Sequence, residues 1–308
     1  MATTGVIIVA GGSGRRMGAA MPKQFMMLGN EPILARSINR IPEALPAAEI
    51  VVVVPEEHIA LWRNIAARFE VARHKIASGG AERFFSVKNG LKELSEDVKI
   101  VAVHDAVRPL ASKKLIIRLI LEAEKSVAVI PVVAPVDSFR RTEGNDSEII
   151  DRSALRIVQT PQVFNADILR KAYEQEFSAT FTDDASVVES IGEKITLCEG
   201  ERGNIKITTP EDMIIANALI EAEQTKTEEY YHQALTLPNN RYDTQFRIPH
   251  RPKNNHQDCS NPAIYHCRSR IIIRPVYGRG FFCVVLISCV GGSVSDAIFD
   301  YAESCVAL

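Results

Sequence analysis

Cysteine is scarce in most of this chain, which excludes a main body held together by disulfide bonds. Of the six cysteines among 308 residues, only Cys198 precedes residue 227. Long apolar runs are missing too, since no stretch reaches the 18 or so apolar residues of a membrane-spanning helix. The first residues have neither the charge nor the apolar length of a signal peptide. We therefore expect a cytoplasmic location and no membrane partner.

An excess of either charge is also missing, because the net charge is −2 with 36 basic and 38 acidic residues. No broad basic surface for nucleic acid is expected, and any ligand-binding basic residues must be local. The chain has no Gly-x-Ser-x-Gly elbow, no His-Glu-x-x-His motif and no cysteine pair with metal-ligand spacing. A reaction without a protein nucleophile fits this pattern, because a phosphate monoester carries about −1.5 to −2 at pH 7 and can itself attack phosphorus.

Short β-branched runs alternate with amphipathic segments along most of the chain. The apolar runs, typical of strands buried on both faces, cover residues 6–9, 50–54, 100–103 and 127–133. The helical patterns between them start near Pro32, Glu57, Glu82 and Ser112. This alternation predicts an α/β, Rossmann-like fold with a mostly parallel sheet and helices on both faces.

The rest of the chain contains one more predicted helix and two segments that break this alternation. A final helix is predicted from Thr209-Pro210-Glu211-Asp212, where a cap, a proline and two acids meet, to near Glu223. Residues 134–158 are polar, lack a helical period and are too long for an ordinary connection, which predicts a protruding, irregular arm. We expect one domain over residues 1–226 and an unassigned, poorly ordered extension over 227–308, where breakers and cysteines gather.

A glycine-rich loop follows the first predicted strand, with the sequence Val9-Ala10-Gly11-Gly12-Ser13-Gly14-Arg15-Arg16-Met17-Gly18. Such loops bring backbone N–H groups close to phosphates, and parallel sheets bind ligands at the carboxyl ends of their strands. The loop is neither a Walker A sequence nor a good dinucleotide fingerprint. Its two arginines suit a triphosphate, and the alternative is a structural turn with a solvated arginine pair.

Three later segments carry further candidate residues. Lys23, in Pro22-Lys23-Gln24, can fold back over phosphates in the glycine loop, although alone it fits a surface lysine better. Asp105 and Arg108 offer an acid for a metal and a base for a phosphate, and the alternative is an ion pair that closes a turn. His104 is expected to be packed or hydrogen-bonded. Lys206 is expected in a short strand that enters the last helix, where a lysine often faces a cleft.

Taken together and in order, these motifs resemble the 2-C-methyl-D-erythritol 4-phosphate cytidylyltransferase family over about residues 5–224. The resemblance is carried by the glycine loop with Arg15-Arg16-Met17, Pro22-Lys23-Gln24, His104-Asp105-Ala106-x-Arg108-Pro109, Thr160-Pro161-Gln162, Thr182-Asp183-Asp184-Ala185-Ser186 and Asn204-Ile205-Lys206. It implies a reaction of CTP with 2-C-methyl-D-erythritol 4-phosphate that needs Mg²⁺, releases pyrophosphate and serves the methylerythritol phosphate route to isoprenoids.

The resemblance also implies individual roles. Arg16 and Lys23 would hold the triphosphate and stabilise charge in the transition state, and Arg152 and Lys206 complete the catalytic set. Nucleotide-binding positions would be Ala10, Gly11, Gly12, Gly14, Gly80 and Ser86. Positions facing the second substrate would be Asp105, Arg108, Ser138 and Thr160. Mg²⁺ would be held mainly by the CTP phosphates, with Asp105 as the one candidate protein ligand. Ser138 and Arg152 lie in the arm, which in this family reaches a twin subunit, so a homodimer is implied.

Two other functions stay open on the sequence alone. A ribitol 5-phosphate cytidylyltransferase shares the glycine loop and the Asp-Ala-x-Arg-Pro motif, and a panel of substrates would separate the two. A nucleotide-binding regulatory protein without turnover would be expected to have lost Arg16 or Lys23, and both are present.

Overall fold

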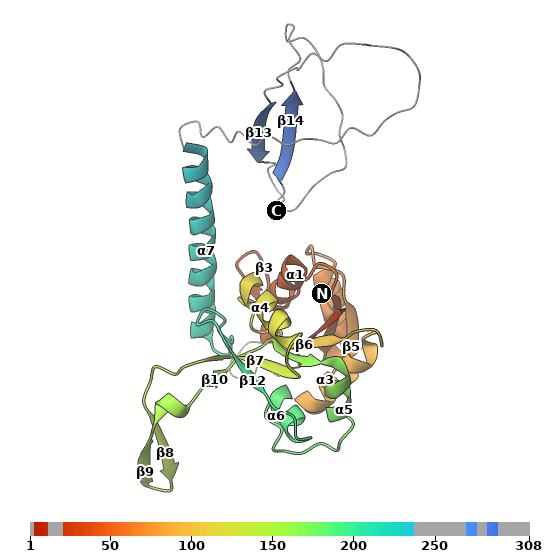
Figure 1. The fold of residues 1–308 in the computed structure, drawn as a ribbon, viewed down its shortest axis with the longest axis vertical. Helices are drawn as coiled ribbons and strands as arrows, with labels where there is room; N and C mark the ends of the chain where they lie inside the picture. Colours follow the sequence, from red (N-terminus) through yellow and green to blue (C-terminus); the bar gives the residue numbers. More distant parts are fainter. Residues whose placement is uncertain (1–2, 12–20, 237–268, 276–281, 289–308) are drawn as a thin grey trace, which may run out of the picture. The chain divides into compact units, whose positions relative to one another are not determined.

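The structure is a computed structural model of the 308-residue chain and describes residues 3–11, 21–236, 269–275 and 282–288. The chain divides into two compact units, Met1–Asn240 and Arg241–Leu308. The first unit contains an eight-stranded sheet with helices packed against it (Figure 1). The described part of the second unit is an antiparallel strand pair, β13 (Ser269–Pro275) and β14 (Phe282–Ser288), in a region where the sequence indicated no regular element.

The main sheet has the strand order β10-β7-β11-β6-β1-β4-β5, with β12 also paired to β7. Its parallel core consists of β1 (Thr4–Val9), β4 (Glu49–Val54), β5 (Lys75–Ser78) and β6 (Ile100–Asp105). The remaining strands are β7 (Ala128–Val133), β10 (Ile157–Val158), β11 (Gln162–Asn165) and β12 (Thr196–Glu199). Strand β11 runs antiparallel between β6 and β7. The predicted α/β fold with a mostly parallel sheet is confirmed.

Each face of the sheet has its own helices because successive strand residues point to opposite sides. On one face, Val6 and Ile8 pack with α1 (Ile33–Ala44), α2 (Ile59–Ala66) and α4 (Lys113–Ala123). On the other face, Ile7 packs with α3 (Arg83–Glu93), α5 (Ala166–Ala172) and α6 (Asp184–Glu189). Burial on both faces explains why the central strands are continuous apolar runs.

Helix α3 approaches the sheet closely at Gly90. A Cβ there would lie 2.7 Å from Ile7 Cγ2 and 2.9 Å from Val53 Cγ2, so a larger side chain would push the helix outward. The segment that leads into α3 is fixed as well, because the Gly79 N–H donates to the carbonyl of Val54, the last residue of β4, at 2.8 Å. The first turn of α3 is therefore anchored at the carboxyl edge of the sheet.

Two predicted helix starts are confirmed by their caps. The Ser112 hydroxyl accepts from the Leu115 N–H at 3.0 Å at the start of α4. At the start of α7 (Pro210–Thr236), the Asp212 carboxylate accepts from the Thr208 N–H at 2.7 Å. The prediction that this last helix ends near Glu223 was wrong, because no glycine or proline occurs between its first turn and Thr236. Within the described chain, α7 included, no helix combines the length and apolar character needed to cross a membrane.

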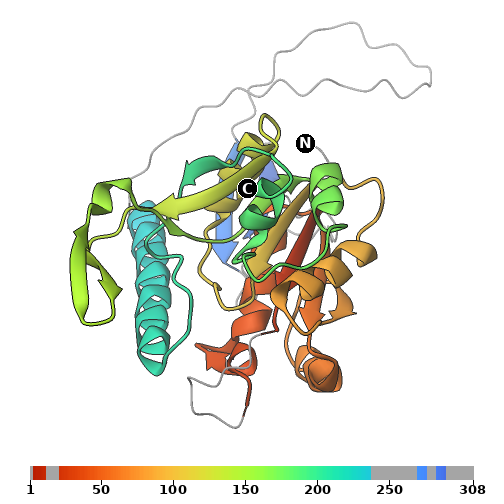
Figure 2. The same cartoon turned by 90° about the horizontal axis from the view of Figure 1, so that it is seen from below.

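The arm predicted as irregular contains a hairpin. Strands β8 (Phe139–Glu143) and β9 (Asp146–Ile150) pair with each other across a turn in which Gly144 has a φ of 57°. A short 3-10 turn, η4 (Arg152–Ala154), follows. The hairpin projects away from the main sheet in both views (Figure 1 and Figure 2). The polar composition hid the strands, since neither strand has a buried face that would impose an apolar alternation.

Candidate active site

Strands β1 and β6 end side by side and bring the start of the glycine loop next to Asp105. Val9 and Asp105 are register partners, and the Ala106 N–H donates to the Val9 carbonyl at 3.0 Å. On the other side of β1, the Ala10 N–H donates to the Val53 carbonyl at 2.8 Å. Open parallel sheets bind their ligands at this edge. Ala10, at the start of the loop, and Asp105 are 95 positions apart in the chain and are thus brought together at the predicted edge of the sheet.

The predicted nucleotide positions Gly11, Gly80 and Ser86 also converge. The Gly80 N–H donates to Ser86 Oγ at 3.0 Å, and a Cβ on Gly11 would lie 3.7 Å from the same oxygen. Gly80 allows a close turn, because a Cβ there would be 2.3 Å from Phe85 Cβ. The first turn of α3 and the end of β1 therefore form two sides of one polar corner.

Lys23 opens the short 3-10 helix η2 (Lys23–Phe25) and is only 9% exposed, so the alternative of a solvated surface lysine is wrong. Its neighbours hold the segment in place. Gln24 Nε2 donates to the Ala10 carbonyl at 2.8 Å, and the Phe25 ring stacks on Trp62 of α2 with centroids 6.0 Å apart. The segment therefore lies against the start of the glycine loop. Gly12, Gly14 and Arg16 lie outside the described residues, and their roles stay predictions.

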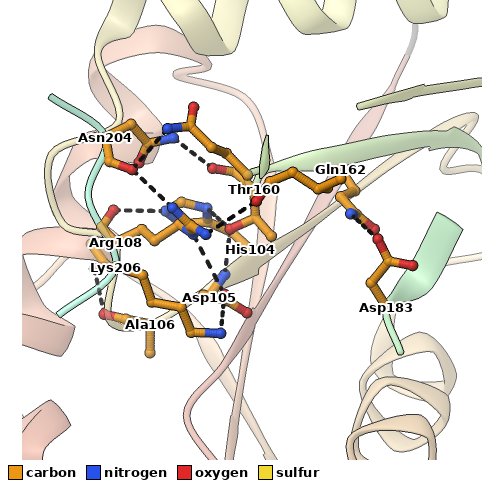
Figure 3. Close-up of polar contacts among 12 residues, drawn as sticks. His104, Asp105, Ala106, Arg108, Thr160, Gln162, Asp183, Asn204 and Lys206 are labelled. Carbon is orange, nitrogen blue, oxygen red and sulfur yellow. Dashed lines mark hydrogen bonds and ion pairs between the residues drawn. The ribbon is translucent and has the colours of Figure 1, made fainter. Parts of the chain in front are cut away.

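Asp105 is surrounded by basic side chains from three parts of the chain. Lys206 Nζ lies 2.9 Å from Oδ2, Arg108 Nε lies 3.6 Å from Oδ2, and Arg83 lies 3.3 Å from Oδ1. Figure 3 shows Lys206 and Arg108 converging on the carboxylate. Burial alone would raise the pKa of Asp105, but the neighbouring charges of Arg83 and Lys206 outweigh it and hold that pKa well below its ordinary value. Asp105 is therefore ionised throughout the working pH range.

The ion pair of Asp105 and Arg108, which the sequence offered as an alternative to a ligand site, is present, but Arg108 makes further contacts. Its guanidinium also donates to the Asn204 carbonyl at 2.9 Å and to the Val158 carbonyl at 3.4 Å. It is only 9% exposed, and burial lowers its pKa. These contacts connect β6 to the segment that carries Lys206.

Lys206 is placed without the short strand that the sequence predicted. The segment 204–208 belongs to no strand or helix, and it is fixed by the Ile207 N–H, which donates to the Val107 carbonyl at 2.9 Å. The side chain of Ile207 is buried, whereas that of Lys206 is 47% exposed. Burial of Ile207 beside the half-exposed Lys206 leaves the lysine side chain between Asp105 and solvent.

His104 is fully buried and hydrogen-bonded, as predicted. Its Nε2 lies 3.1 Å from the Arg108 carbonyl, which can only accept, so Nε2 carries the proton. Nδ1 then accepts from the Thr160 hydroxyl at 3.0 Å, and the Thr160 oxygen accepts from the Asp105 N–H at 3.0 Å. Burial lowers the pKa of His104 to about 4. The neutral ring therefore supports Asp105, and a contact of Thr160 with substrate stays a prediction.

Ser138 and Arg152 lie on the arm, apart from the other predicted site residues. Both are exposed, and the Arg152 guanidinium donates to the Val136 carbonyl within the arm. Among the contacts of the described residues, those of Arg152 stay inside the arm. Within one chain, the arm residues are therefore not brought together with the other predicted site residues.

One basic residue at Asp105 received no role from the sequence. Arg83 begins α3 and pairs with Asp184 as well as with Asp105. Its position three residues after Gly80 was the local signal, because its partner Asp184 is 101 positions away.

The sheet and the basic cluster at its carboxyl edge are those of an α/β nucleotidyltransferase. Solved structures of similar fold include a 4-diphosphocytidyl-2C-methyl-D-erythritol synthase from Anaerococcus prevotii, with a TM-score of 0.62 and 29% identity over 71% of this chain and 96% of that one. Another is a 2-C-methyl-D-erythritol 4-phosphate cytidylyltransferase from Thermus thermophilus, with a TM-score of 0.58 and 31% identity over 71% of this chain and 98% of that one.

Sequence comparison identifies the family. The family model for 2-C-methyl-D-erythritol 4-phosphate cytidylyltransferase matches residues 4–222. Enzymes of that name from Bacteroides fragilis and Phocaeicola vulgatus are 47% and 44% identical, each over 70% of this chain and 98% of the relative. This chain belongs to the 2-C-methyl-D-erythritol 4-phosphate cytidylyltransferase family.

Proposed function

We propose that this chain transfers a cytidylyl group from CTP to 2-C-methyl-D-erythritol 4-phosphate in the methylerythritol phosphate route to isoprenoids. A phosphate oxygen of the alcohol phosphate attacks the α-phosphorus of CTP. The bond from that phosphorus to the bridging oxygen breaks, and pyrophosphate leaves with that oxygen. Family membership and the curated relatives support this reaction over the ribitol 5-phosphate alternative.

The observation that carries the proposal is the basic cluster around Asp105, one register pair from the start of the glycine loop. Both reactants are phosphates, so the enzyme must mainly hold negative charge in line and stabilise its redistribution. Lys206 is suited to this because its half-exposed ammonium can contact an incoming phosphate while Asp105 fixes its direction. Lys23 and Arg16 would neutralise the triphosphate from the side of the loop.

Mg²⁺ does not fit a site made of protein ligands alone. No group of three or more His, Cys, Asp or Glu side chains that could hold a metal occurs in the described part of the chain. Both oxygens of Asp105 already face cations, since Oδ1 faces Arg83 and Oδ2 faces Lys206 and Arg108. A metal there would need phosphate oxygens as further ligands, in line with the prediction that Mg²⁺ is held mainly by CTP.

The homodimer is proposed on the position of the arm. Ser138 and Arg152 are exposed on either side of the β8–β9 hairpin, which projects from the sheet (Figure 1), and this position suits groups that complete the site of a second subunit. Exposed apolar residues on the arm and nearby, including Val136, Ile149 and Ile157, offer area for such a contact. The cytoplasmic location expected from the sequence likewise stays a prediction.

The test is pyrophosphate release from CTP with Mg²⁺ in the presence of either 2-C-methyl-D-erythritol 4-phosphate or ribitol 5-phosphate. Reactions without the second substrate serve as the control for CTP hydrolysis. We expect release with the first alcohol phosphate only, and the CDP-linked product should appear in equal amount. Release only with ribitol 5-phosphate would keep the fold and chemistry but reject the proposed substrate. No release with either would reject the proposed activity for this chain.

A further inference from the structure

Arg83 holds two carboxylates with one guanidinium group. One terminal nitrogen lies 3.3 Å from Asp105 Oδ1, and the other donates to Asp184 Oδ2 at 2.5 Å. Asp105 belongs to the proposed site, whereas Asp184 lies at the first residue of α6 and is fully buried. Arg83 therefore links Asp105, at the carboxyl edge of the sheet, to the buried carboxylate of Asp184.

The Asp184 carboxylate is held by a second partner as well. Asp184 Oδ1 accepts from the Tyr173 hydroxyl at 2.6 Å, and the Tyr173 ring stacks on Phe84 with centroids 4.8 Å apart. Burial and the charge of Asp184 raise the pKa of Tyr173 well above its ordinary value, so the hydroxyl stays a donor. Both oxygens of the buried carboxylate are thus occupied, one by Tyr173 and one by Arg83.

The start of helix α6 fixes the position of Asp184. Asp183 caps the helix by accepting from the Ser186 N–H at 2.9 Å. Gln162 of β11 donates to Asp183 at 2.8 Å and accepts from the Ala185 N–H at 3.0 Å. Gln162 and the Thr-Asp-Asp-Ala-Ser motif, which received no role above, therefore fix Asp184 relative to β6, the neighbour of β11.

Around Asp105 the cations divide between the two oxygens. Lys206 and Arg108 lie against Oδ2, and Arg83 lies against Oδ1. Without Arg83, Oδ1 would lose its ion pair and the carboxylate could turn about its own bond. The planar fork of arginine can meet two carboxylates at once, whereas the single ammonium of lysine is a point charge and cannot match both directions.

We propose that Arg83 is a positioning residue, held by Asp184 and Tyr173, that fixes the Asp105 carboxylate and through it the Lys206 ammonium for the second substrate. This rests on the proposed cytidylyl transfer. Arg83 acts through Asp105, so its loss affects use of the alcohol phosphate more than use of CTP.

The test is a double-mutant cycle between Arg83→Gln and Asp105→Asn, with KM for each substrate and kcat measured by pyrophosphate release. In the otherwise native enzyme, Arg83→Gln should raise KM for 2-C-methyl-D-erythritol 4-phosphate on the order of tenfold and leave KM for CTP within about twofold. In the Asp105→Asn background the same change should alter kcat/KM for the alcohol phosphate less than about twofold. Arg83→Lys should recover only part of the loss.

The matched control is Arg40→Gln, which breaks a 2.7 Å ion pair with Glu223 on α7 and should leave both KM values unchanged. Equal losses from Arg83→Gln in both backgrounds, or equal rises in both KM values, would overturn the inference. Tyr173→Phe leaves Arg83 in place and removes one hydrogen bond to Asp184. If thermal unfolding shows that Arg83→Gln is not folded, Tyr173→Phe decides, with an expected rise in the alcohol-phosphate KM of about twofold to threefold.

Wild-type enzyme in the same assay separates the two proposals. If it releases no pyrophosphate, the proposed function fails and this inference fails with it. If it turns over while the cycle shows no coupling between Arg83 and Asp105, only the inference fails.

Discussion

The carboxyl edge of the sheet and the arm of residues 134–158 both carry residues predicted to belong to one active site, yet they are built in opposite ways. At the edge, Asp105 and Arg108 are 8% and 9% exposed and lie among charged partners from several elements. In the arm, every residue of β8 is exposed, and β8 and β9 pair only with each other. The edge is held by the core, whereas the arm is held by its own backbone hydrogen bonds.

Because of this difference, mutations at the edge and mutations in the arm should affect different properties of the protein. A residue at the edge contributes to folding and to substrate binding, so its substitution should change both the free energy of unfolding and the kinetics. A residue on the arm has few packing partners, so its substitution should change the kinetics alone. Each prediction below tests one side of that contrast.

The largest effect is expected at Lys23, on the edge side. Lys23→Ala should lower kcat by on the order of 10²-fold or more, because a preorganised charge at the triphosphate is removed. Pyrophosphate release under saturating substrates measures it. An unchanged rate would remove Lys23 from the catalytic set.

Arg108→Ala should cost stability as well as activity. It removes the hydrogen bond to the Asn204 carbonyl and one of the cations at Asp105. Breaking a buried ion pair on one side costs about 3 kcal/mol or more in many proteins, and here Arg83 and Lys206 remain, so a loss of roughly 2 kcal/mol is expected. Urea unfolding followed by circular dichroism measures it, and a loss below about 0.5 kcal/mol would show that the edge is not held as described.

Arg152→Ala should show the reverse pattern. Its side chain is exposed on the arm, so the free energy of unfolding should stay within about 0.5 kcal/mol of wild type. KM for the alcohol phosphate should rise on the order of tenfold, with KM for CTP nearly unchanged. Wild-type kinetics in this variant would exclude the arm from the site.

The smallest effect concerns pH and the edge again. The pKa of His104 is lowered to about 4 in the folded chain, so between pH 6.5 and 4 the unfolded chain binds a proton that the folded chain does not. Stability must therefore fall as the pH drops through that interval, by about 1 kcal/mol between pH 6.5 and 5.5. Urea unfolding at both pH values measures the difference. His104→Gln should make the difference smaller, and an equal difference in that variant would assign the effect to other groups.

Much of the fold could be predicted because strands buried on both faces of a sheet appear in the sequence as continuous apolar runs. Residues 6–9, 50–54 and 100–103 all lie within central strands, and the Ser112 cap starts a helix. Strand β11 was not predicted because its four residues are too few to show a period. The hairpin was missed for the opposite reason, since its exposed faces select no apolar alternation.

The site could be predicted where its residues stand next to one another in the chain. Asp105 and Arg108 are three positions apart, whereas Gly80 and Ser86, which share a hydrogen bond, were indicated only by the family resemblance. Arg83 was missed because its role depends on Asp184, 101 positions away, and no local pattern reports such a pair. Lys206 was found, but the strand expected to carry it is absent, because one hydrogen bond to Val107 replaces a full ladder.

The contrast between edge and arm is tested most directly by mixing two impaired variants and assaying them with the alcohol phosphate well below its KM. Lys23→Ala impairs the site of its own chain, and Arg152→Ala impairs the site of the partner subunit, which the arm would complete. The two proteins are unfolded together, refolded as a mixture and compared with each variant refolded alone by pyrophosphate release. If the arm completes the site of a twin subunit, each mixed dimer contains one site with both residues intact.

We expect the mixture to recover about one quarter of wild-type activity, because half of the dimers are mixed and half of their sites are complete. Under these conditions Arg152→Ala refolded alone should show about one tenth of wild-type activity, and Lys23→Ala about one hundredth or less. A mixture no more active than the average of the two variants would contradict the account, because it would place Arg152 and Lys23 in the same chain's site or leave the arm without a role.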